Sequence, residues 1–176
     1  AEVGPPQPAI PRTLSLLRAD KPIRVLAMPP YDGLIEGLLR KLKPGTRVEV
    51  TSWPVEGQPL KKIEQDAAKR VRAMKPDLVL IAVPRSAGAA SAEEFIHSYS
   101  WIMNHSLSFS YQQWDCVIVH PSVADPGGGD ADHDALVRRL VRAQDLHLVD
   151  RPKDSRTGSA KILEDWFGRQ LMSESK

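Results

Sequence analysis

The sequence predicts an α/β fold, a three-layer sandwich in which a five-stranded parallel sheet lies between helices. Five short apolar segments alternate with segments of helical periodicity, a pattern typical of this class. The continuous apolar run at 78–83 indicates a central strand covered on both faces. At 176 residues the chain is long enough for one hydrophobic core. We therefore expect one main domain whose strands are joined by right-handed crossovers.

The first elements are an N-terminal arm or linker over 1–21 and then the start of a domain over 22–176. Proline-rich residues 1–12 lack a hydrophobic period, whereas Leu14, Leu16 and Leu17 indicate a short helix or an arm packed on the domain. A buried strand is expected at 23–28, followed by a tight turn. Asp32 is a plausible N-cap for the next helix. The apolar positions of that helix are Leu34, Ile35, Leu38, Leu39 and Leu42.

The middle of the chain repeats the strand–helix unit. A half-apolar strand is expected at 47–51, and the next helix begins at Pro59, a favoured first helical residue. Basic side chains cover one face of this helix, which we interpret as its solvent-exposed face. Ser91 and Glu94 form a capping box before the following helix. The inward-facing residues of that helix are Phe95, Tyr99, Ile102 and Met103.

The C-terminal part supplies two more units. Strands are expected at 116–119 and 146–149. Two helices follow these strands, with apolar positions at Leu136, Val137, Leu140, Val141, and at Ile162, Leu163, Trp166, Phe167, Leu171.

The carboxyl ends of parallel strands meet at one edge of the sheet, so the loops after them should build any site. These loops span 29–32, 52–57, 84–86, 120–122 and 150–153. A Ser-His-acid triad can be drawn from Ser86, His120 and Asp32, provided that their side chains meet within hydrogen-bond distance. His120 is also well explained as a strand-end histidine with a local partner. The remaining candidates in these loops are Ser52, Ser122 and Asp150.

Composition excludes several classes of function. The net charge is +2 and no basic tract argues for nucleic acid. No apolar run reaches the roughly 18 residues of a membrane span, and no glycine-rich loop indicates a nucleotide cofactor. Cys116 is the single cysteine, and its apolar surroundings indicate a small buried side chain.

An acidic cluster and the chain start complete these expectations. Asp130, Asp132, His133 and Asp134 could in principle bind a cation, but they coincide with a helix start, where acidic residues cap free N–H groups. We expect neither a metal nor a cofactor. The N-terminal segment fits a mature start left by signal-peptide cleavage or a linker, which leans towards a secreted or periplasmic protein.

The order and spacing of these blocks resemble the SGNH (GDSL-type) hydrolase family over about residues 22–172. The family motif Gly-Asp-Ser-x-Thr-x-Gly aligns with 27–33, where Pro29 takes the nucleophile position and only Gly33 is kept. Gly57 matches the glycine of the oxyanion hole, and Ser86 takes the place of the oxyanion asparagine. The last block, Asp-x-x-His, falls on 150–153.

The resemblance implies an SGNH-type sandwich with a flavodoxin-like strand order and, for intact members, serine ester hydrolysis. Here Pro29 and Lys153 occupy the nucleophile and base positions, although Asp150 keeps the acid position, so the family mechanism cannot run. We therefore expect a catalytically degenerate binding, interaction or structural module. Its crevice would suit a small polar or carbohydrate ligand, and the expected crevice residues are Asp32, Trp53, Gly57, Arg85, Ser86, His120 and Lys153.

Two alternatives stay open. An active ester or acyl hydrolase could use a relocated site, with Ser86 or Ser52 beside His120. A flavodoxin-like or receiver-like domain would share the strand order. Receivers, however, need acidic residues where this chain has Met28-Pro29 and Pro84-Arg85.

Overall fold

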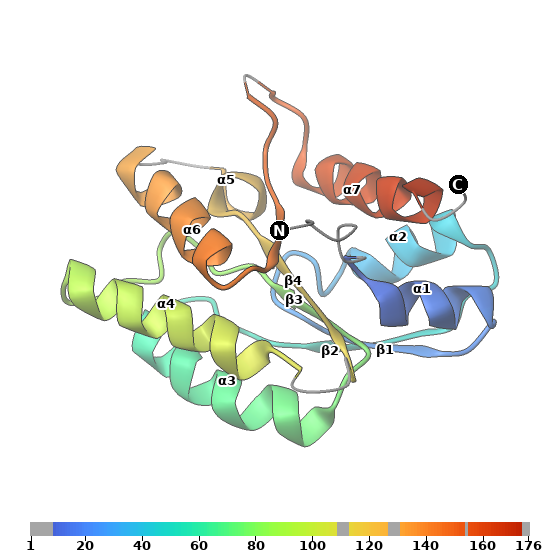
Figure 1. The fold of residues 1–176 in the computed structure, drawn as a ribbon, viewed down its shortest axis with the longest axis horizontal. Coiled ribbons are helices and arrows are strands. Elements are labelled where there is room, and N and C mark those ends of the chain that lie inside the picture. Colours follow the sequence, from blue (N-terminus) through green and yellow to red (C-terminus); the bar gives the residue numbers. More distant parts are fainter. Residues whose placement is uncertain (1–8, 109–112, 127–130, 154, 174–176) are drawn as a thin grey trace, which may run out of the picture.

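The fold is a three-layer α/β/α sandwich around one parallel sheet (Figure 1). The computed structural model describes residues 9–108, 113–126, 131–153 and 155–173. Its strands are paired in the order β2-β1-β3-β4-β5, and every pair is parallel. The predicted fold class and strand order are therefore confirmed. The strands are β1 Ile23–Ala27, β2 Val48–Ser52, β3 Leu78–Ile81, β4 Asp115–Val119 and β5 His147–Val149.

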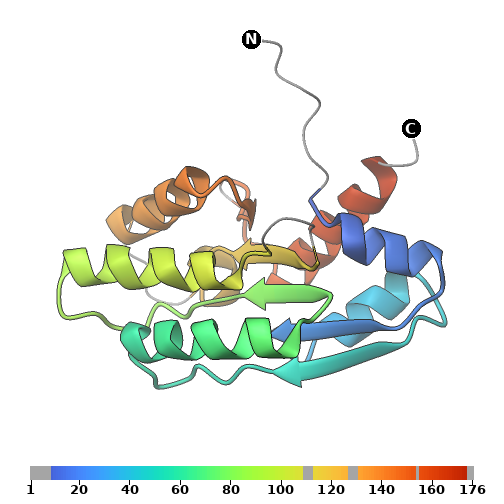
Figure 2. The same cartoon turned by 60° about the horizontal axis from the view of Figure 1, so that its bottom comes forward.

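Helices cover both faces of the sheet. α3 and α4 lie side by side, with α6 next to α4, while α1, α2 and α7 gather on the other side (Figures 1 and 2). The crossovers thus place each helix against the apolar strand faces that the alternation predicted. The helices are α1 Pro11–Arg18, α2 Ile35–Leu42, α3 Leu60–Met74, α4 Ala92–Ser106, α5 Pro121–Ala124, α6 Ala131–Ala143 and α7 Ser159–Ser173.

The core lies along the central strands. Every residue of β3 and β4 is buried, whereas the edge strand β2 alternates between half-buried and exposed residues. This contrast follows from position, because a central parallel strand is covered on both faces and an edge strand is not. Cys116 is buried in β4, as predicted, and burial raises the pKa of its thiol to about 12.

α1 is packed on the sheet, so the prediction of a short packed helix is confirmed. Leu14 and Leu17 are buried, and Thr13 donates from its backbone N and from Oγ to the Asp115 carboxylate at 2.6 and 2.7 Å. Arg12 adds an ion pair with Asp77 at 2.9 Å. The boundary proposed between an arm and the domain stays a prediction, and residues 1–8 lie outside the described residues.

Two predicted helix starts are wrong. Asp32 does not cap α2, which begins at Ile35 after Leu34 and has no side-chain cap. The reason is a run of turns around buried Tyr31, and the Asp32 carboxylate instead accepts hydrogen bonds from Gly33 N and Ser52 Oγ.

Pro59 precedes α3 as its cap residue rather than opening the helix, because its backbone is extended with ψ 154°. The predicted capping box of α4 is confirmed. Glu94 N donates to Ser91 Oγ at 3.1 Å, and the Glu94 carboxylate accepts from the backbone N of Ala90.

Candidate functional site

The loops after the strands begin in register at the carboxyl edge of the sheet. The backbone ladder continues one residue past two strands, since Trp53 N donates to Ala27 O and His120 N donates to Val149 O, both at 2.9 Å. These bonds fix where each loop leaves the sheet. The loops that follow β1, β3 and β4 therefore project from a rigid base, as expected for a site of an open α/β sheet.

His120 is a fully buried histidine at the end of β4. Its Nε2 lies 3.0 Å from the backbone O of Asp134, and a carbonyl oxygen only accepts, so Nε2 carries the proton. Its Nδ1 accepts from Ser122 N at 3.1 Å and lies 2.7 Å from Ser122 Oγ. Burial lowers the pKa of His120, which favours this neutral form. The prediction of a strand-end histidine with a local partner is confirmed.

Asp150, at the family's acid position, is held by arginine. Its carboxylate accepts from Arg138 Nε at 2.6 Å and Nη2 at 3.1 Å, and from Arg151 N at 2.8 Å. Burial by itself would raise the pKa of Asp150, but the Arg138 hydrogen bonds and nearby positive charge outweigh it, so the pKa is below its ordinary value. Asp150 Oδ1 is 3.6 Å from His120 Nδ1. The acid is therefore committed to Arg138.

The drawn triad of Ser86, His120 and Asp32 is not assembled by hydrogen bonds. Asp32 accepts from Ser52 Oγ at 2.6 Å, and both ring nitrogens of His120 have other partners. Ser86 is exposed on its own loop. The serine beside His120 is Ser122, and the signal for it was the sequence His-Pro-Ser. Proline at the first helical position starts a turn that folds the Ser122 N–H onto the imidazole.

Two pockets open at this edge. The first, which we call the switch-point pocket, lies by the loops after β1 and β3, where the strand order reverses. Its volume is about 360 Å³. Pro29, at the nucleophile position, forms part of its wall. The lining residues are Pro29, Pro30, Val55, Glu56, Pro84, Ser86, Ala124 and Asp125.

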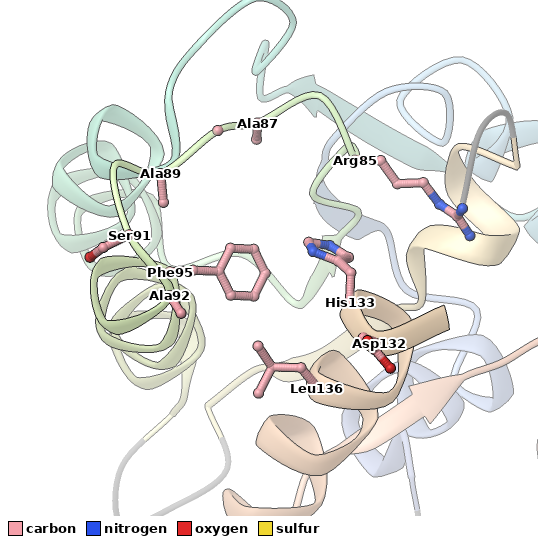
Figure 3. A pocket seen from close by; sticks show the side chains of 10 residues that line it. Arg85, Ala87, Ala89, Ser91, Ala92, Phe95, Asp132, His133 and Leu136 are labelled. Carbon is pink, nitrogen blue, oxygen red and sulfur yellow. The ribbon is translucent and has the colours of Figure 1, made fainter. Parts of the chain in front are cut away.

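The second, which we call the α4–α6 pocket, lies beside the first and has a volume of about 410 Å³. Arg85 stands between the two, because its backbone N donates to Asp125 at 3.1 Å and its Nη2 contacts Asp134 at 3.0 Å. Figure 3 shows the rings of Phe95 and His133 facing each other across it. The lining residues are Arg85, Ala87, Gly88, Ala89, Ser91, Ala92, Phe95, Asp132, His133 and Leu136.

The predicted crevice residues have different fates. Arg85 and Ser86 each line one of the two pockets. Trp53 and His120 are fully buried, so the prediction that they face a ligand is wrong. Trp53 turns into the core because the β2 ladder continues through its backbone N.

The other three predicted crevice residues, Asp32, Gly57 and Lys153, line neither pocket. Gly57 has φ 71°, in the left-handed region that favours glycine, so its backbone alone explains this residue.

Metal and membrane features were also sought. Among the described residues, no group of three or more His, Cys, Asp or Glu side chains could hold a metal ion. In the acidic cluster, Asp134 pairs with Arg85, and Asp130 lies outside the described residues. None of the described helices is both long and apolar enough for a membrane span.

Comparison with solved structures shows that this is the fold of SGNH (GDSL-type) esterases. The acetyl xylan esterase AlAXEase superposes with a TM-score of 0.56 and 14% identity, over 88% of this chain and 100% of that one. A variant of Axe2, an acetyl xylan esterase from Geobacillus stearothermophilus, gives 0.58 and 13%, over 85% and 94%.

A GDSL-like lipase from Bacteroides thetaiotaomicron gives a TM-score of 0.51 and 12% identity, over 89% of this chain and 90% of that one. No protein-family model and no curated protein match the sequence. The similarity to solved structures therefore defines the fold and leaves the activity to be argued from the site.

Proposed function

We propose that this chain is an SGNH-type domain without esterase chemistry, which acts as a binding module. The observation that carries the proposal is Pro29, which stands at the nucleophile position and lines the switch-point pocket. Proline has no hydroxyl to attack an ester and no N–H to stabilise an oxyanion. The base position holds Lys153, whose side chain is exposed. A serine esterase needs both a nucleophile and a base.

The surviving acid supports the same proposal. In a triad, the carboxylate orients the histidine that activates the serine. Asp150 instead makes a two-point ion pair with Arg138. A guanidinium in that geometry competes directly for the carboxylate lone pairs. The former acid therefore contributes to holding β5 and α6 together.

The ligand that we propose for the switch-point pocket is a small carbohydrate or a similarly polar molecule. Three proline rings offer apolar faces, and Glu56 and Asp125 offer carboxylates that accept hydrogen bonds from hydroxyl groups. The acetyl xylan esterases that share this fold act, by their names, on a carbohydrate ester. A pocket of about 360 Å³ has the size of a small-molecule site.

Two measurements test the proposal. The protein should hydrolyse p-nitrophenyl acetate no faster than its Ser86→Ala variant and the buffer, and a fluorophosphonate probe should label no serine. A titration with xylo-oligosaccharides, followed by amide chemical shifts, should move signals of Glu56 and Asp125. Turnover that disappears in a serine variant would overturn the non-catalytic proposal. Shifts confined to other residues would overturn the assignment of the pocket.

One observation favours a second candidate, an ester hydrolase with a relocated site. Ser122 Oγ lies 2.7 Å from the unprotonated Nδ1 of His120, and the Asp134 carbonyl orients the ring. This pair has the contact that a nucleophile and its base require. Neither residue lines either pocket, however. Fluorophosphonate labelling of Ser122 that disappears in Ser122→Ala would establish this candidate, and intact Ser122 at neutral pH would eliminate it.

A further inference from the structure

We propose that the α4–α6 pocket is a second ligand site and that it takes a small aromatic alcohol, meaning one aromatic ring with a hydroxyl group. This site is separate from the switch-point pocket. It rests on its own residues, so its test does not depend on whether the domain is an esterase. The reasons are the apolar interior of the pocket, a histidine with unused hydrogen-bonding capacity, and walls that are already fixed.

The interior is apolar and open. Figure 3 shows the Phe95 ring and the Leu136 side chain directed into the pocket, with the methyl groups of Ala89 and Ala92 on the α4 side. A Cβ added at Gly88 would meet no atom within 4 Å, so this part of the wall has free space. Apolar and aromatic walls with few polar groups are typical of small-molecule sites. Such an interior favours a ligand with a flat apolar ring.

His133 brings the polar contact into this interior. Its ring meets the Phe95 ring edge-on, with centroids 4.7 Å apart and planes at 62°. Within the described residues, no hydrogen bond is seen to either imidazole nitrogen of His133. An imidazole offers a donor or an acceptor to a hydroxyl group, which can itself donate and accept. An aromatic ligand can therefore stack beside Phe95 while its hydroxyl pairs with His133.

The walls are pre-organised. Arg85 is anchored to Asp125 and Asp134, and the backbone O of Gly88 accepts from Leu60 N at 3.0 Å. On the opposite side, the Ser91–Glu94 capping box fixes the first turn of α4. A ligand that enters a site already held in place loses less free energy to ordering the protein. The pocket is therefore suited to a small rigid molecule.

Amide chemical shifts of the full chain, titrated with phenol, test this site. Saturable shifts should centre on Phe95, His133 and Leu136. Toluene, which lacks the hydroxyl, and cyclohexanol, which lacks the aromatic ring, should each bind about tenfold more weakly, since one lost contact of this kind weakens binding by that order. His133→Phe keeps a ring but removes the hydrogen bond, so its affinity for phenol should fall to the level seen for toluene.

Matched variants separate this site from non-specific binding. Ala89→Leu places a larger side chain in the pocket from an exposed position and should abolish phenol binding. Ala90→Leu makes the same change at the exposed neighbour that does not line the pocket, and it should leave binding unchanged. Ser86→Leu narrows the switch-point pocket and should also leave it unchanged. Equal binding of phenol to the Ala89→Leu and Ala90→Leu proteins, or shifts centred on the switch-point pocket, would overturn the proposal.

Discussion

Both edges of the sheet hold charged side chains, but they use them differently. At the amino edge, Asp77 and Asp115 stand side by side at the starts of β3 and β4, and their carboxylates accept hydrogen bonds from Arg12, Thr13 and Arg24. At the carboxyl edge, Arg85 Nε and Asp134 Oδ1 are buried without a hydrogen-bond partner among the described residues. The amino edge therefore uses its charges to hold the fold together, and the carboxyl edge keeps unused capacity for binding.

The largest expected effect is at the amino edge. Replacing Asp115 by Ala removes a buried acceptor and leaves Thr13 N, Thr13 Oγ and Arg12 N without their partner. Each buried polar group that loses its partner costs about 1 kcal/mol or more, so the free energy of unfolding should fall by about 3 kcal/mol. Urea denaturation followed by circular dichroism measures this change.

A matched control shows whether burial is the cause. Asp165→Ala also removes an aspartate with one ion pair, to Lys161, but on an exposed helix face. Its free energy of unfolding should change by less than about 0.5 kcal/mol. Equal losses in the two variants would contradict the assignment of a structural role to the amino edge.

The second prediction concerns His120 and pH. Because burial lowers the pKa of His120 in the folded state, the unfolded chain binds the proton more readily as the pH falls below about 6.5. The folded state should therefore lose stability on acidification from pH 7.5, until the pH reaches the lowered folded-state pKa. Thermal unfolding at a series of pH values measures this slope.

His120→Gln is the variant for comparison. It should cost about 2 kcal/mol at pH 7.5, because buried partners lose their hydrogen bonds, and it should flatten the slope between pH 7.5 and 5. Charges around the ring from Asp134, Arg138 and Asp150 remain in this variant. An unchanged slope would show that another group controls the acid response.

The third prediction tests whether Asp150 has a structural role. Arg138→Met removes a half-exposed, two-point partner and should lower the free energy of unfolding by about 1 kcal/mol at pH 7. The pKa of Asp150 is lowered in the folded state, so the wild-type advantage holds above about pH 3.8 and declines as the pH falls through the folded pKa. Carboxyl chemical shifts should show a higher pKa for Asp150 in the variant.

The smallest expected effect is at Lys153, the residue at the family's base position. Its side chain is exposed and lines neither pocket. Lys153→Ala should therefore change the free energy of unfolding by less than about 0.5 kcal/mol. Lys153→His should not create hydrolysis of p-nitrophenyl acetate, because Pro29 still lacks a nucleophile. Activity in that variant would show that another residue serves as the nucleophile.

Local patterns predicted the elements of this protein better than its contacts. The alternation of apolar and helical segments identified each strand to within a residue or two, and Ser91 with Glu94 located the start of α4. Asp32 shows where such reasoning stops. An aspartate before a helical pattern is a good cap, but Ser52, twenty positions away in the sequence, lies close enough in the fold to use its carboxylate. Sequence periodicity carries no information on such distant partners.

The sequence by itself determined the fold class, the strand order and the absence of a serine at the nucleophile position. These follow from hydrophobic spacing and residue identity, which are local properties of the chain. Only the tertiary structure decided that His120 pairs with Ser122, that Trp53 is buried, and that Phe95 and His133 enclose a pocket. Side-chain partners and cavities depend on how separate elements pack, and packing is set by the whole core rather than by any one segment.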